Sequence, residues 1–110
     1  MAQGRISYAR LFARHGVPAT LIRLAEPTNI ELVITVLRRY AEEEPMAHEV
    51  SQQESRFTLE WAQLNAGAFP MPVLKGDRIL QAGEYFTVRL VRPLETHGEL
   101  TGYEIRCIGG

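Results

Sequence analysis

Three histidines and one cysteine are the side chains of this 110-residue chain best suited to metal binding or nucleophilic chemistry. His15, His48 and His97 lie far apart in the sequence, and none has a second ligand beside it at helix or turn spacing. A zinc site needs three or four converging ligands, so this pattern favours surface histidines. Cys107 lies in an apolar, strand-like segment without an adjacent activating base. We therefore expect an inert buried thiol.

Other motifs that signal catalysis or cofactor binding are equally weak. The serines lack a nucleophile elbow, and Lys75-Gly76-Asp77 lacks the glycine run and following helix of a phosphate loop. Glu42-Glu43-Glu44 suggests a cation site, but a run of charges without fixed geometry is usually a solvated face. The sequence predicts a protein that is not an enzyme, with no catalytic, cofactor-binding or metal-binding residues.

The C-terminal Gly109-Gly110 resembles the tail of the ubiquitin-like sulfur carriers, in which the last carboxylate is adenylated and thiolated. The fold of those carriers has a hairpin followed by a helix packed on the sheet. In this chain an acidic, proline-containing segment follows the first predicted hairpin instead. A sulfur carrier stays open as an alternative function.

Composition limits the class of protein and of partner. Twelve basic and thirteen acidic residues leave a formal charge of −1, which gives no global electrostatic signature for nucleic acid or anionic membrane. The length predicts one domain, 1–110. No apolar run approaches the roughly 18 residues of a spanning helix, and the start lacks the apolar region of a signal peptide. With one cysteine, these features predict a reducing compartment, most simply a cytoplasm, and no membrane partner.

Alternating apolar residues predict strands in the second half of the chain. Residues 74–80 and 84–91 are predicted strands joined by a tight turn at Ala82-Gly83, where glycine allows a positive φ. A second turn or loop is expected over 93–99 and a last strand over 103–108. The period of two places Phe86, Val88 and Leu90 on one face of the second strand, and Tyr103, Ile105 and Cys107 on one face of the last.

The first half has a predicted hairpin, formed by 19–24 and 30–37 around a turn at 26–29. The segment 30–37 also fits helical spacing, but its many β-branched residues favour a strand. Residues 56–61 alternate like a strand and are expected to pass into a helical turn over 62–66. The predicted fold class is mainly β, a small antiparallel β-barrel or sandwich with a short N-terminal helix and a long loop.

Two segments outside this predicted core are candidates for partner contact. Residues 1–16 form an arm whose predicted helix, 7–16, is the most basic part of the chain, and residues 41–55 form a long acidic loop. Two interpretations of the arm stay open: its basic residues form a solvated polar face, or the arm becomes ordered when it binds a partner. Two interpretations of the loop also stay open: it contacts a partner, or it is an extension of the hairpin without a role. The candidate contact residues are Tyr8, Arg10, Arg14, Glu42, Glu43, Glu44, Met46 and His48.

The chain from Ala66 onward resembles small head–tail connector proteins of tailed bacteriophages and prophages, the head-completion or head-closure group. The resemblance lies in the proline-containing approach Ala66-Gly67-Ala68-Phe69-Pro70-Met71-Pro72, in Lys75-Gly76-Asp77-Arg78-Ile79, in the hairpin Gly83-Glu84-Tyr85-Phe86-Thr87-Val88, and in the last strand, Tyr103 to Ile108. It covers about half of the chain, and it assigns no role to the N-terminal helix.

The resemblance implies a structural protein that assembles as a ring beneath the portal after DNA packaging and presents a surface to the tail. Its expected partners are portal or adaptor proteins, tail proteins and its own copies, with a monomer possible in isolation. DNA would pass through the ring without being read in sequence. The protein would be made in the host cytoplasm and then join the virion. A minor tail component on the same barrel and a small-barrel binding module of a cellular protein are the further alternatives.

Overall fold

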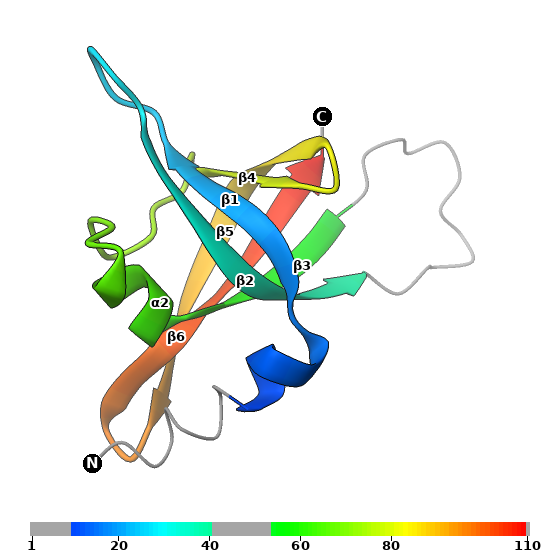
Figure 1. The fold of residues 1–110 in the computed structure, drawn as a ribbon, viewed down its shortest axis with the longest axis vertical. Coiled ribbons are helices and arrows are strands. Elements are labelled where there is room, and N and C mark those ends of the chain that lie inside the picture. Colours follow the sequence, from blue (N-terminus) through cyan, green and yellow to red (C-terminus); the bar gives the residue numbers. More distant parts are fainter. Residues whose placement is uncertain (1–9, 41–53, 110) are drawn as a thin grey trace.

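The computed structural model describes residues 10–40 and 54–109, which form a closed barrel of six antiparallel strands (Figure 1). The strand order around the barrel is β1-β2-β3-β6-β5-β4. This confirms the mainly-β prediction and shows a barrel rather than a sandwich. The strands are β1 (Val17–Arg23), β2 (Ile30–Tyr40), β3 (Glu54–Glu60), β4 (Arg78–Gln81), β5 (Glu84–Thr96) and β6 (Glu99–Gly109).

Two short helical segments accompany the barrel. Residues 10–15 are helical and precede β1, while α2 (Trp61–Ala66) follows β3. The first segment confirms the described part of the predicted helix, and it is held to the barrel by buried Phe12. It ends at Gly16, whose N–H donates to the carbonyl of Phe12 at 2.9 Å and whose backbone leaves no room for a Cβ. The helix α2 confirms the predicted turn over 62–66.

The first predicted hairpin is confirmed, with β1 and β2 in antiparallel register. The segment 30–37 is a strand because its apolar residues alternate between the interior and the outside, with Ile34 and Val36 buried. β2 continues through Arg38 to Tyr40, and β3 begins at Glu54. The predicted loop 41–55 was therefore too long at its C-terminal end, because Glu54 and Ser55 pair with β6. Its residues 41–53 lie outside the described residues.

The turn or loop predicted over 93–99 is a turn and is much shorter than predicted. β5 runs to Thr96 and β6 begins at Glu99, so the turn consists of His97 and Gly98, with φ values of 53° and 79°. Pro93 does not break the strand, because β5 pairs with β4 only over Glu84–Thr87 and has no strand on that side at Pro93. A proline at such an edge removes no ladder hydrogen bond.

The prediction that Phe86, Val88 and Leu90 lie on one face of the strand was wrong, because Phe86 and Val88 are buried and Leu90 is not. The pairing of β5 with β6 shifts between Val88 and Leu90, which inserts Arg89 as a bulge. One extra residue reverses the alternation beyond it, so Leu90 is 53% exposed and Val91 packs against the core instead.

The interior is filled by the inward residues of all six strands. Phe57 and Phe86 meet edge to face at its centre, with ring centroids 5.4 Å apart. Leu64 of α2 and the following residues Phe69 and Val73 belong to the same cluster, so the connection after β3 packs against the barrel core. On the wall, Gly102 passes so close to the carbonyl of Leu59 that a Cβ would clash.

Candidate partner-contact surfaces

A buried ion pair fixes the connection between α2 and β4. The predicted strand 74–80 begins only at Arg78, because Asp77 closes a turn instead. Its carboxylate accepts from Arg23 Nε at 2.9 Å, from Arg23 Nη2 at 2.8 Å and from the N–H of Leu74 at 2.8 Å. The hydrogen bond to Asp77 raises the pKa of Arg23, partly offset by burial. These contacts are structural, and they occupy the guanidinium of Arg23 at the base of the β1–β2 hairpin.

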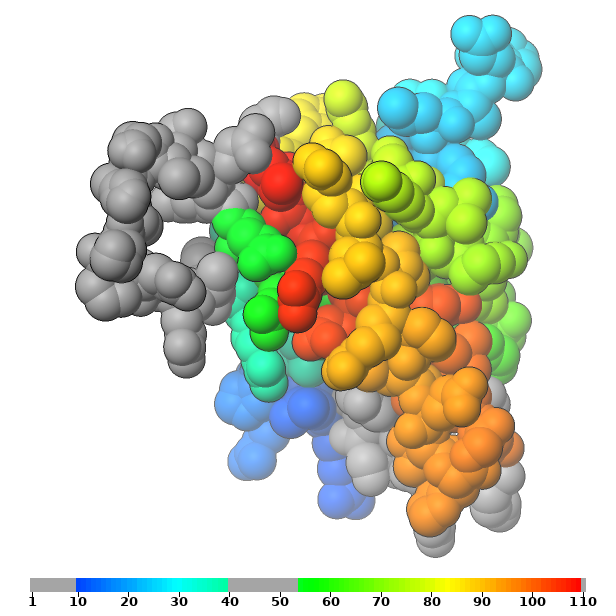
Figure 2. All heavy atoms as spheres, turned by 180° about the vertical axis from the view of Figure 1, so that it is seen from behind, coloured from blue at the N-terminus to red at the C-terminus, as the bar shows by residue number. Residues whose placement is uncertain are grey.

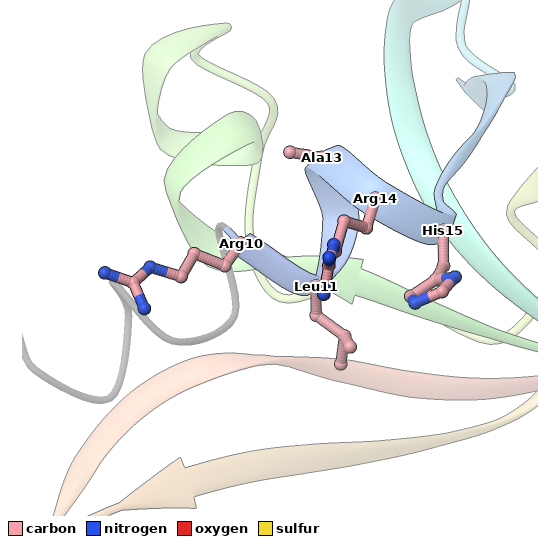
Figure 3. Close-up of a pocket in the computed structure, with 5 residues that line it drawn as sticks. All are labelled: Arg10, Leu11, Ala13, Arg14 and His15. Atoms are coloured by element: carbon pink, nitrogen blue, oxygen red, sulfur yellow. The ribbon is translucent and has the colours of Figure 1, made fainter.

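Of the predicted contact residues, the described ones are Arg10 and Arg14, both exposed on the N-terminal helical segment. They line a pocket of about 510 Å³ together with Leu11, Ala13 and His15 (Figure 3). Arg10 points away from Arg14 and His15, so the basic groups do not converge on one point (Figure 3). The arrangement is a basic surface rather than a site for a small anion. Tyr8, Glu42, Glu43, Glu44, Met46 and His48 lie outside the described residues.

A row of arginines crosses the outer wall of the barrel, and the sequence had not indicated it. Arg39 of β2 pairs with Arg56 of β3, which pairs with Arg106 of β6. Arg106 in turn lies opposite the β5 bulge that contains Arg89. The strands β3, β6 and β5 lie side by side on this side of the molecule, in green, red and yellow to orange (Figure 2). We call Arg39, Arg56, Arg89 and Arg106 the arginine face.

Among residues 10–40 and 54–109, no ion pair includes an arginine of the arginine face. The ion pairs among the described residues join Arg23 with Asp77 and Arg92 with Glu104. The Nε of Arg56 is buried without a hydrogen-bond partner in the described structure. Neighbouring strands are about 4.8 Å apart, and like charges directly opposite each other are destabilising. Such a face is suited to an anionic partner.

A second surface lies at the tip of the β1–β2 hairpin, residues 24–31, which projects from the barrel (Figure 1). Leu24 and Ile30 are 54% and 38% exposed, and Glu26 and Glu31 are exposed beside them. The N–H of Ala25 donates to the side-chain oxygen of Asn29 at 3.0 Å, which orders the turn. We call residues 24–31 the hairpin tip; it is apolar and acidic.

The sequence shows the individual residues of these two surfaces, but it does not show which residues lie side by side. Arg56 and Arg106 are polar residues between buried neighbours, Ser55 and Phe57 for the first and Ile105 and Cys107 for the second. Their alignment depends on the order β2-β3-β6-β5, which joins strands distant in sequence. The hairpin tip was predicted as a turn, without a role.

Cys107 and Gly109, which were considered for chemistry on the basis of the sequence, are parts of the barrel itself. Cys107 is fully buried, and burial together with the charge of Glu54 raises its pKa to about 12. Gly109 is part of β6 and pairs with Phe86, so it belongs to the barrel wall. Across residues 10–40 and 54–109, no three His, Cys, Asp or Glu side chains are grouped as metal ligands would be.

No helix in the described part of the chain has both the length and the apolar character needed to cross a membrane. No protein-family model matches this chain and no curated protein matches it in sequence, so membership in the head–tail connector family stays a prediction.

Proposed function

We propose that this chain is a structural protein of a tailed bacteriophage or prophage that joins head and tail as a ring at the portal–tail junction. The observation that carries the proposal is the closed barrel in which the segments of the resemblance are neighbours. The hairpin β4–β5 and the last strand β6 pair side by side, and the connection before β4 is fixed by Asp77. The resemblance requires these elements to form one small barrel.

The distribution of side chains supports assembly rather than catalysis as the role. The described chain carries an apolar, acidic hairpin tip and an arginine face that makes no ion pair among the described residues, on different parts of one small barrel. Exposed apolar side chains and unpaired charges of one sign are features of surfaces that meet other proteins. The partners in this proposal are portal or adaptor proteins, tail proteins and further copies of the chain.

The experiment is quantitative mass spectrometry of purified particles from the phage or induced prophage that encodes the chain, combined with lysine- and carboxylate-directed cross-linking. We expect several copies per particle and cross-links to both portal and tail proteins. Cross-links confined to tail proteins would instead identify a minor tail component. Complete absence from the particles would overturn the proposal.

A further inference from the structure

We infer that the hairpin tip of one copy docks on the arginine face of a second copy, and that this contact builds the ring. The inference rests on the proposed function for its biological setting, but the contact itself follows from two surfaces of the described barrel. One is an apolar and acidic projection. The other is a row of arginines beside an exposed leucine.

The two surfaces complement each other in chemistry. Leu90 is 53% exposed and pairs with Arg106, so an apolar side chain lies within the arginine face. Leu24 of the hairpin tip is exposed to the same degree, and the exposed Glu26 and Glu31 belong to the same hairpin tip. Docking would pack Leu24 against Leu90 and set the two carboxylates among the arginines. Both apolar side chains would leave water, and the row of like charges would gain counter-charges.

The same contact cannot form within one copy. Ile30 and Arg39 lie near opposite ends of β2, and nine residues of strand span about 30 Å. The hairpin tip also points away from the end of β2 that carries Arg39 (Figure 1). The base of the hairpin is fixed by the ion pair of Arg23 with Asp77, so it does not fold back. The contact therefore needs a second molecule.

Because the two surfaces differ, the contact is heterologous. Each copy offers its hairpin tip to one neighbour and its arginine face to the other, and such contacts close into a ring when the rotation between copies allows it. The hairpin tip has eight residues, whereas a stable complex uses roughly 20–30 residues on each side. We therefore expect monomers in dilute solution and rings when copies are gathered on a partner.

Cysteine cross-linking of the full chain tests the contact. Cys107 is fully buried, so cysteines introduced at exposed positions are the accessible thiols. With a short bis-maleimide at high protein concentration, the double variant Leu24→Cys/Leu90→Cys should give a ladder of oligomers. A mixture of Leu24→Cys and Leu90→Cys single variants should stop at dimers, and neither single variant should cross-link to itself. Leu24→Cys mixed with Leu74→Cys, an exposed leucine outside the arginine face, is the matched control and should stay monomeric.

Exchange of charges tests the attraction between the carboxylates of the hairpin tip and the arginine face. Arg56→Glu/Arg106→Glu should lower the cross-linked fraction about tenfold, and adding Glu26→Arg/Glu31→Arg should restore it. Glu84→Arg/Glu95→Arg, two exposed carboxylates outside the hairpin tip, should not restore it. Far-ultraviolet circular dichroism of each variant confirms that the barrel is folded.

Three outcomes would overturn the inference. Dimers of Leu24→Cys with itself would show a symmetric contact, and absence of a ladder both in solution and in assembled particles would show that the surfaces do not meet. Loss of the ladder on adding duplex DNA, with anisotropy of a labelled duplex falling for Arg56→Glu/Arg106→Glu, would assign the face to nucleic acid. If the chain proves absent from phage particles but the ladder forms, the proposed function fails while this inference stands.

Discussion

At the scale of single residues, the carboxylate of Asp77 accepts three hydrogen bonds from two different parts of the described chain. It binds Arg23 through two nitrogens and caps the N–H of Leu74, with 5% of its side chain exposed. Arg23 also donates to the carbonyl of Pro72 at 3.0 Å and lies 5.1 Å from the centre of the Phe69 ring. One ion pair thus joins β1 to the connection between α2 and β4.

We expect Asp77→Ala to lower the free energy of unfolding by about 2–4 kcal/mol, because it leaves a partly buried guanidinium and a backbone N–H without their acceptor. Asp77→Asn should cost less, since the amide oxygen still accepts from Leu74. Urea unfolding followed by tryptophan fluorescence measures both, with Lys75→Ala as the exposed control. A change of less than about 0.5 kcal/mol for Asp77→Ala would show that the ion pair does not hold the connection.

Cys107 makes the stability of the barrel sensitive to alkaline pH. Burial raises its pKa to about 12, whereas an unfolded chain loses the thiol proton near pH 8.5. Between these values the unfolded state binds fewer protons than the folded state, so the free energy of unfolding falls as pH rises. Below about pH 8 the thiol is protonated in both states, and its contribution to the free energy of unfolding is fully present.

We expect the free energy of unfolding to fall by roughly 2 kcal/mol between about pH 8 and about pH 10 because of the buried thiol. Burial raises the pKa of Tyr103 as well, so a smaller decrease should persist in Cys107→Ala. Urea unfolding at the two pH values measures the difference between the wild type and this variant. Equal pH dependence in both proteins would rule out Cys107 as its source.

At the scale of elements, α2 completes the edge of β2 where β3 does not pair with it. β2 pairs with β3 only over Leu37–Tyr40, which leaves Thr35 without a strand on that side. The N–H of Thr35 donates to Gln63 Oε1 at 2.7 Å, and Gln63 Nε2 donates to the carbonyl of Thr35 at 3.1 Å and to Glu60 Oε1 at 2.9 Å. The amide side chain thus takes the place of a neighbouring peptide group.

We expect Gln63→Ala to lower the free energy of unfolding by about 1–3 kcal/mol, because it removes the partners of partly buried backbone groups. Amide hydrogen exchange should accelerate at Thr35 more than at Ile34, whose strand neighbour is Ala19 of β1. Gln63→Glu cannot donate to the carbonyl of Thr35 and sets a second carboxylate beside Glu60, so it should not restore protection. Unchanged exchange at Thr35 in Gln63→Ala would contradict this role.

The elements themselves could largely be predicted from local pattern. The β-branched residues of 30–37, the glycine after Ala82 and the short helical turn after Trp61 each led to the element that the structure has. The bulge at Arg89 could not be predicted, because it depends on the pairing of β5 with β6. The arginine face was missed for the same reason, since its register is set between strands far apart in the sequence. Gln63 gave no signal because its partner, Thr35, is distant.

At the scale of the whole molecule, the barrel separates surfaces of different chemistry. The hairpin tip is apolar and acidic, the arginine face is basic, and the β5–β6 hairpin extends at the other end of the molecule (Figure 1). Such a distribution leaves the formal charge near zero while the surfaces at the two places differ in chemistry. The proposed ring would use this difference, because each copy in a ring meets its two neighbours through unlike faces.

Removal of the gene from the encoding phage or prophage tests the joining role most directly, with electron microscopy of the lysate as the measurement. We expect DNA-filled heads and separate tails to accumulate, and supply of the wild-type chain from a plasmid to restore complete particles. Normal numbers of infectious, tailed particles without the chain would contradict a role in joining head and tail.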